Sequence, residues 1–211
     1  MTQQAIDTVD HAFQVINLRE IDLNITNRCN LDCRHCAFAS HIGDTNELSL
    51  ETIRSIIEDA SELGCKEIHL TGGEPTIHSE FDQVLELILQ SGMFTRLISN
   101  GVMPRSRLQR FFDKGLRHLL FSIDGMQKSH DRIRGRKGLF EKTLSRAEDA
   151  KDMGYSVRVN AVAMQDNLHD LIPLYREVAS IGVDTYSVFL YTPTGRNAQQ
   201  QLNLMIQPDQ W

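Results

Sequence analysis

Three of the four cysteines in this sequence, Cys29, Cys33 and Cys36, fall within eight residues. Their C-x3-C-x2-C spacing puts three thiols on one short loop, where they can converge on one soft metal ion or one iron–sulfur centre. Disulfides do not explain the cluster, because the fourth cysteine, Cys65, is distant in sequence and an odd thiol would remain. The loop is therefore expected to bind a metal centre, and the rest of the chain must fold so as to present it.

The number of thiols distinguishes two kinds of metal site. A structural zinc site uses four protein ligands, and an electron-transfer cluster usually has four thiolates. Three thiolates on a four-iron cluster leave one iron open, which favours chemistry over a structural role. The alternative is a Cys3His zinc site, since His35 lies between two of the cysteines and His41 follows them.

Composition narrows the class of protein. The 211 residues with 41% hydrophobic content suit a single domain, and a net charge of −6 with no long basic run argues against nucleic acid as a partner. The polar start, residues 1–18, predicts a loose N-terminal lead-in and has no apolar core like that of a signal peptide. No run of apolar residues approaches the length of a membrane span. Free thiols and no secretion signal predict a cytoplasmic protein.

From residue 19 to residue 211 the pattern predicts one domain in which strands and helices alternate. Strands are expected at 20–26, 67–70, 94–98, 117–123, 155–163 and 183–190, and helices at 49–64, 79–92, 104–114, 139–153 and 170–180. Ser49 and Ser79 are the expected starts of the first two helices, and a long loop is expected before residue 139. Such alternation predicts an α/β fold with parallel strands, either open and doubly wound or curled into a partial (β/α)6 TIM-like barrel.

Polar residues stand where these strands end, which is where parallel α/β folds carry their sites. They are Thr26, Thr71-Gly72-Gly73-Glu74-Pro75, Ser99-Asn100-Gly101, Ser122, Asp124, Asn160, Thr192, Thr194 and Arg196. Each has a structural alternative, because Gly-Gly and Asn-Gly pairs are common in turns and Asn160 could be a satisfied core amide. Taken together, they are expected to converge on one rim beside the cysteine loop.

The side chains near that rim indicate a ligand class. Paired glycines at Gly72 and Gly73 let a ligand approach the backbone closely. The carboxylate of Glu74 suits an ammonium group, and Arg134 could bind a carboxylate through two hydrogen bonds. A small molecule with both groups is an amino acid, and its amine and carboxylate could also fill an open iron position.

With these residues in view, the sequence resembles the radical S-adenosylmethionine (SAM) superfamily. The resemblance rests on C-N-L-D-C-R-H-C at residues 29–36, TGGEP at 71–75, FSIDG at 121–125, HDRIRG at 130–135 and PTGR at 193–196. It covers roughly Glu20 to Trp211 and is similar to the branch whose members usually carry a C-terminal SPASM or twitch extension with auxiliary clusters. No cysteines suited to such clusters occur in this sequence. We expect a core domain whose auxiliary-cluster cysteines would lie beyond Trp211; if the chain ends there, the auxiliary-cluster assignment fails.

The resemblance implies a [4Fe-4S] cluster on Cys29, Cys33 and Cys36, with SAM bound at the open iron. The reduced cluster would cleave SAM to methionine and a 5′-deoxyadenosyl radical, which takes a hydrogen atom from a substrate. The residues that match cofactor-binding positions are Gly72, Gly73 and Glu74 for the methionine amine, Ser122 and Arg134 for its carboxylate side, and Ser99, Asn100 and Asn160 for the ribose or methionine part. His35 stands where the family often has an aromatic residue near adenine.

The expected function is therefore that of a radical SAM enzyme acting in peptide or protein modification or in cofactor (tetrapyrrole) biosynthesis. Expected partners are a reductant such as flavodoxin or ferredoxin and a peptide or small-molecule substrate. Two alternatives stay open: a non-catalytic zinc or iron–sulfur binding module, and a degenerate barrel that binds the cofactor as a scaffold. No residue can be assigned as the substrate's acid or base.

Overall fold

The computed structural model describes residues 18–195 and 202–207, so the predicted lead-in at 1–18 lies almost wholly outside the described residues. Six parallel strands form one sheet in the order β1-β2-β3-β4-β5-β6, and each strand pairs with the next one along the chain. The strands are β1 (Glu20–Asn24), β2 (Glu67–Thr71), β3 (Phe94–Ser99), β4 (His118–Ser122), β5 (Ser156–Ala163) and β6 (Thr185–Leu190).

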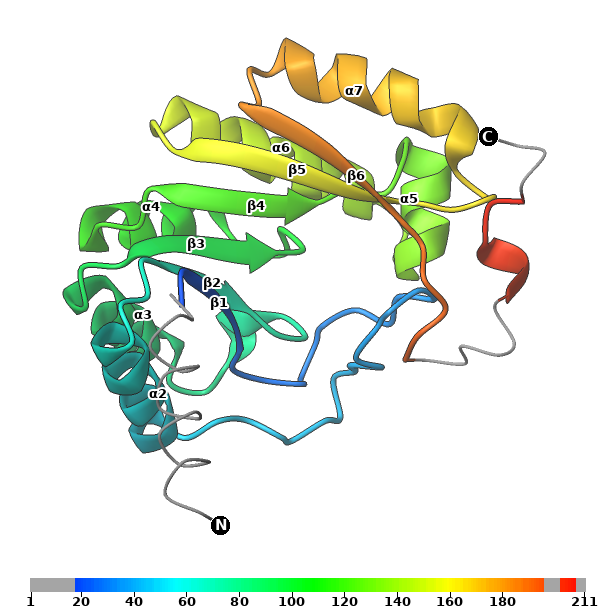
Figure 1. Cartoon of the computed structure of the whole chain (residues 1–211). Helices are drawn as coiled ribbons and strands as arrows, with labels where there is room; N and C mark the ends of the chain where they lie inside the picture. The colour runs from blue at the N-terminus through cyan, green and yellow to red at the C-terminus, as the bar shows by residue number, and fades with distance from the viewer. Residues whose placement is uncertain (1–17, 196–201, 208–211) are drawn as a thin grey trace, which may run out of the picture.

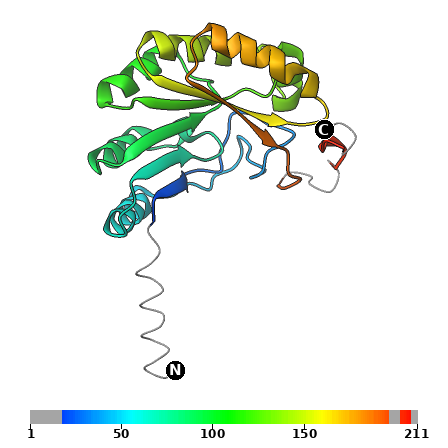
Figure 2. The same ribbon diagram turned by 45° about the horizontal axis from the view of Figure 1, so that its top comes forward.

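Helices connect the strands, and all but the helix at 127–134, which lies near the carboxyl ends of the strands, run along the outer face of the curved sheet (Figure 1). They are α2 (Leu50–Glu62), α3 (Phe81–Gln90), α4 (Arg105–Lys114), α5 (Gln127–Arg134), α6 (Leu139–Asp152) and α7 (Leu171–Ser180), with short 3-10 turns η1 (Pro75–Ile77) and η2 (Leu168–Asp170). Because β1 and β6 end the sheet and do not pair, the structure is a half-barrel (Figure 2). The predicted α/β partial barrel is confirmed.

The main core lies between the sheet and these helices. Outward-facing strand residues such as Ile68, Leu97 and Phe121 are fully buried against apolar helix faces. Burial of this apolar area is the main stabilising contribution to such a core. On the opposite face, His69 and Arg96 are polar, and they form a network with Glu67. The apolar surface is therefore on the helix side, and the concave side is left for a site.

Two local predictions about helices are wrong. Ser49 does start α2, since its hydroxyl accepts a hydrogen bond from the Thr52 amide at 3.1 Å. Ser79, however, does not start α3: its hydroxyl and amide both donate to the carboxylate of Glu47, and the helix begins at Phe81 after Glu80. Ser79 therefore bonds to Glu47, 32 residues earlier in the chain, and does not cap the helix that follows it.

The segment before residue 139 is the second correction, because it contains helix α5 and not a long loop. The buried residues of α5 are Ser129, His130, Ile133 and Arg134, only one of which is apolar. A helix whose buried face is mostly polar carries no hydrophobic periodicity, so the pattern that identifies helices could not find it.

Candidate cofactor site

The cysteine loop lies at the carboxyl end of the sheet and is held there by backbone contacts with other loops. The amide of Glu74 donates to the Arg28 carbonyl at 2.9 Å, and the amide of Arg34 donates to the Ile133 carbonyl at 2.9 Å. The Cys29 amide donates to the His41 carbonyl at 3.2 Å. The loop is therefore positioned by two segments distant from it in sequence and by His41, shortly after its last cysteine.

The glycines of the second loop allow this close approach. Gly72 has φ of +156°, and a Cβ atom there would lie 2.6 Å from the Thr26 carbonyl oxygen. A Cβ on Gly73 would collide with the carbonyls of Asn27 and Arg28, at the start of the cysteine loop. The paired glycines are thus needed for the two loops to pack together, as well as for any ligand that approaches them.

A cavity of about 370 Å³ opens beside the three cysteines. Ten of the twelve predicted site residues line it: Cys29, Cys33, His35, Cys36, Gly72, Gly73, Ser99, Asn100, Ser122 and Arg134. The strand-end residues Thr192 and Thr194 also line it, whereas Arg196 lies outside the described residues. The structure brings together predicted residues from five of the six strand ends, so most of the expected rim exists as one cavity.

Glu74 and Asn160 do not line this cavity. Glu74 is 1% exposed, and its carboxylate accepts hydrogen bonds from the Thr76 amide and hydroxyl, the Ser99 hydroxyl and the Asn100 amide at 2.6–3.3 Å. Burial raises the pKa of Glu74, against the lowering effect of these donors. The carboxylate therefore fixes the turns after β2 and β3, and its contact with an ammonium group stays a prediction. The cofactor contact of Asn160 also stays a prediction. This residue is half-buried on β5 beside Ser122.

Asn100 connects the turn after β3 to the cysteine loop. Its side-chain amide donates to the Asn30 side-chain oxygen at 2.7 Å and lies 4.0 Å from the sulfur of Cys29. The side-chain oxygen of Asn100 accepts from the Val102 amide at 2.9 Å. This residue can orient the first cysteine, a role that the Asn-Gly turn motif alone does not indicate.

Below the cavity lies a buried ion pair between Asp124 and Arg134. The Arg134 Nε donates to Asp124 Oδ2 at 2.7 Å, and the Val162 amide donates to Asp124 Oδ1 at 2.9 Å. Although burial opposes its charge, the guanidinium of Arg134 and the nearby His35 ring hold the pKa of Asp124 at about 2. Asp124 therefore stays ionised and keeps Arg134 in place with its remaining nitrogens available to a carboxylate.

His35, on the cysteine loop, also contacts Asp124. Its Nε2 lies 3.4 Å from Asp124 Oδ2, and its buried Nδ1 has no protein partner. Burial lowers the pKa of His35, so the ring is neutral near pH 7. A neutral ring that lines the cavity with one nitrogen unsatisfied suits a polar heterocycle such as adenine.

Other residues of the site were missed by the sequence analysis. They are apolar or aromatic: Leu31, Phe38, Ile98, Val162, Leu190 and Tyr191. Ile98 and Val162 occupy inward-facing strand positions, so strand alternation could have indicated them. Nothing in the sequence pattern distinguishes Leu31 or Phe38 from other loop residues.

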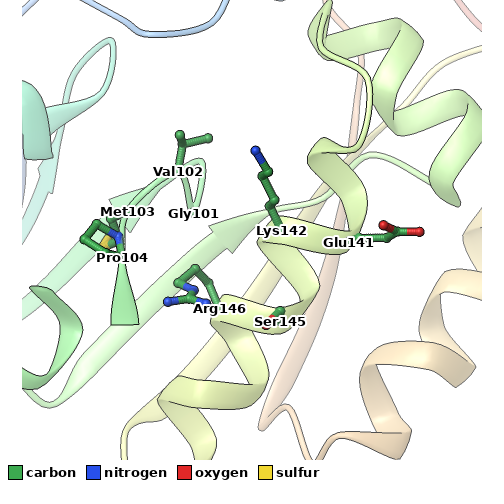
Figure 3. A pocket seen from close by; sticks show the side chains of 8 residues that line it. All are labelled: Gly101, Val102, Met103, Pro104, Glu141, Lys142, Ser145 and Arg146. Carbon is green, nitrogen blue, oxygen red and sulfur yellow. The ribbon is translucent and has the colours of Figure 1, made fainter. Parts of the chain in front are cut away.

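A larger hollow, of about 460 Å³, lies elsewhere, between the turn after β3 and the first half of α6 (Figure 3). Its lining residues include Val102, Pro104, Lys142 and Arg146, and Figure 3 shows their side chains spread around an open space. None of its lining residues is a cysteine, and the strand ends contribute little to it. The smaller cavity beside the cysteines is therefore the candidate cofactor site.

The donor set fits an iron–sulfur cluster better than a single zinc ion. Four ligands of one zinc ion must lie close together, since each Zn–S bond is only about 2.3 Å long. Among the described residues, only one group of three or more His, Cys, Asp or Glu side chains has all its ligand atoms within 4.8 Å of one another. This group is Glu20, Glu67 and His69, and it contains no cysteine. Thiols spread around a cavity, with no fourth cysteine near them, suit a larger cluster with an open corner.

Neither histidine of the zinc alternative is arranged as a fourth ligand. His41 is exposed, and its Nδ1 accepts a hydrogen bond from the Gly43 amide at 3.1 Å. His35 contacts Asp124. Cys65 is buried on the helix side, where its sulfur contacts the Glu67 carbonyl oxygen at 3.3 Å. Cys65 is thus a small core residue, as its place in the sequence suggests.

In the free protein Cys29 and Cys33 are protonated near pH 7. Burial raises the pKa of Cys29 to about 11 and that of Cys33 to about 12. A bound metal centre must displace these protons, because the thiolate is the ligand.

This fold and this site define a half-barrel that presents three cysteines beside a cavity for a small polar ligand. The chain belongs to the radical SAM superfamily, whose family model matches residues 23–178. Members of this superfamily hold a [4Fe-4S] cluster and SAM, and the residues lining the cavity fit both groups.

Curated relatives agree with this assignment. The sequence is 29% identical over 177 residues to an AdoMet-dependent heme synthase of Nitratidesulfovibrio vulgaris, covering 82% of this chain and 48% of the relative. It is 33% identical over 151 residues to a PqqA peptide cyclase of Ruegeria pomeroyi, covering 70% of this chain and 40% of the relative. The chain spans about half the length, or less, of these relatives.

Solved structures share the fold. SuiB of Streptococcus suis bound to S-adenosylmethionine has a TM-score of 0.77 at 19% identity, covering 94% of this chain and 49% of SuiB. Methylornithine synthase PylB has a TM-score of 0.75 at 15% identity, covering 97% of this chain and 65% of PylB. No helix among the described residues combines the length and the apolar character needed to cross a lipid bilayer.

Proposed function

We propose that this chain acts as a radical SAM enzyme on a peptide substrate. The main support for this proposal is that three free cysteines, the glycine loop and Arg134 line one cavity at the carboxyl end of a half-barrel. When bound, the reduced cluster and SAM supply a 5′-deoxyadenosyl radical, formed with methionine by one-electron cleavage of the sulfonium C–S bond. The electron comes from a low-potential protein donor such as a flavodoxin or ferredoxin in the cytoplasm.

The chain's own residues are proposed to bind and orient. Cys29, Cys33 and Cys36 hold the cluster, and the backbone of Gly72 and Gly73 approaches the amine of the ligand. Arg134, fixed by Asp124 at 2.7 Å, takes the ligand's carboxylate. Peptide chemistry is supported by PqqA peptide cyclases among the relatives, and tetrapyrrole chemistry is the other candidate, because heme synthases are among them too.

Anaerobic reconstitution tests the proposal. The protein should bind about four irons and four sulfides per chain and, after reduction, should convert SAM to 5′-deoxyadenosine without any added substrate. Cys33→Ala should lose both properties. Cys65→Ala is the matched control, because it removes a buried thiol outside the site, and it should keep them. One zinc and no iron, or a reduced cluster that yields no 5′-deoxyadenosine, would refute the proposal.

A further inference from the structure

Strand β6 has an exposed apolar stretch at the edge of the sheet. It pairs with β5 on one side and has no partner strand on the other among the described residues. Val188, Phe189 and Leu190 are consecutive and 44%, 55% and 53% exposed. Three consecutive exposed apolar residues on an open edge invite pairing with another chain, and proteins normally avoid them unless they have a function.

The opposite edge of the sheet is protected. β1 carries the charged residues Glu20 and Asp22, and the chain beyond it is covered by residues 41–48. The Leu48 amide donates to the Ile25 carbonyl at 2.9 Å, and the Asn27 amide donates to the Asn46 carbonyl at 2.9 Å. Charges and a covering segment are the usual protections of an edge strand. β6, with the sequence TYSVFL, has no charged residue and no such cover among the described residues.

The edge of β6 leads directly to the cofactor site. Leu190, at its end, lines the cavity, and so do Tyr191, Thr192 and Thr194. A Cβ on Gly195 would collide with the Cys36 and Ala37 carbonyls, so this segment packs against the cysteine loop. Figure 1 shows β6 and the segment after it running toward that loop. At about 3.3 Å per residue, the four steps from Val188 to Thr192 span about 13 Å in extended chain.

We propose that the open edge of β6 is the docking site for the peptide substrate, which binds in extended form as a seventh strand. This inference rests on the proposed function. An edge strand offers alternating N–H and C=O groups that a peptide backbone matches and a tetrapyrrole does not. The apolar side chains at residues 188–190 fit a segment with uncharged, apolar or β-branched side chains. A residue a few positions along that segment then reaches the cavity.

The probe is a peptide selected from a random dodecapeptide display library against the full chain with its cluster and SAM. Alternate amides of β6 bond to β5, so exchange is read at those amides of residues 188–190 that face the open edge. Their exchange should be fast without the peptide and at least tenfold slower with it. Val188→Lys should weaken peptide binding at least tenfold, because a charge blocks strand addition. Val188→Thr, which keeps the β-branched shape, should bind within about twofold of the parent protein.

A second control separates edge blocking from added charge. Ile172 on α7 is an exposed apolar residue, 61% exposed, and Ile172→Lys should bind the peptide like the parent protein. The inference is overturned if no peptide is enriched, or if Val188→Lys and Ile172→Lys bind equally well. It is also overturned if the edge-facing amides of residues 188–190 are already protected in the free protein, and sedimentation then shows whether a second copy covers them.

Formation of 5′-deoxyadenosine without peptide distinguishes this inference from the proposed function. If Val188→Lys still forms it but no longer binds peptide, both stand. If the parent protein forms none but the peptide still protects residues 188–190, the docking site stands and the proposed function fails.

Discussion

The ion pair between Asp124 and Arg134 makes a quantitative prediction about stability. Asp124 is fully buried, and its pKa of about 2 lies below the ordinary value of 3.8. A difference of nearly two pKa units corresponds to roughly 2–3 kcal/mol of stability when the carboxyl is ionised. Asp124→Asn also leaves the guanidinium of Arg134 buried without its partner, and removing one member of a buried pair costs about 3–5 kcal/mol. We therefore expect Asp124→Asn to lower the free energy of unfolding by about 3–5 kcal/mol.

Urea unfolding measures this loss. With an m value of about 2–3 kcal/mol per M, the midpoint of Asp124→Asn should fall by about 1–2.5 M at pH 7. Asp82→Asn is the matched control: the same substitution at the exposed pair with Arg110, whose side chains are 42% and 52% exposed, should cost less than about 1 kcal/mol. Equal costs for the two variants would refute the reasoning.

The pH dependence gives an independent check. Because folding lowers the pKa of Asp124, its contribution is complete above the unfolded value near 4 and is lost as the pH falls toward the folded value of about 2. The difference in midpoint between the parent protein and Asp124→Asn should therefore be constant from pH 5 to 8 and shrink below about pH 4. A difference that stayed unchanged down to pH 3 would show that the charge is not what stabilises the fold.

Three further predictions concern the loops. Gly73→Ala should lower the iron bound on reconstitution, measured by iron assay, because its Cβ collides with the carbonyl of Arg28. Glu74→Gln should cost about 2 kcal/mol in urea unfolding, because the new amide group faces hydrogen-bond donors and leaves one unpaired. Asp166→Ala breaks a partly exposed ion pair with Arg34 at 3.1 Å, and should change the unfolding free energy by less than about 1 kcal/mol.

Most of the site could be predicted from the sequence because its residues lie in short motifs at strand ends. Two motifs can be recognised from adjacent residues alone: the spacing of Cys29, Cys33 and Cys36, and the Gly72–Gly73 pair. Parallel strands then bring such ends together by topology, without any detailed knowledge of packing. This is why a list of strand ends matched the lining of the cavity so closely.

What could not be predicted depends on contacts between distant residues. The contact of Glu74 with a ligand's ammonium group stays a prediction, but nothing in the sequence indicated that Ser99 and Asn100 from the next strand end supply donors to its carboxylate. Helix α5 was not predicted because its buried face consists largely of polar residues, and the partners of His130 and Arg134 lie outside the helix. His130, for example, accepts a hydrogen bond from the Asp124 amide at 3.1 Å. Hydrophobic periodicity in the sequence does not reveal hydrogen-bond partners that come from other segments of the chain.

These contacts imply that cluster binding and folding of the rim are coupled. The cysteine loop takes its position from the Glu74 amide, the Asn100 side chain and the end of α5, each from a different strand connection. A cluster that binds only the correctly placed loop must stabilise all three connections, because ligand binding to the folded form favours that form. Cluster loading should therefore slow hydrogen exchange at residues 72–74, 99–102 and 133–135 together, although none of them is a cysteine. Slowing confined to residues 29–36 would contradict this coupling.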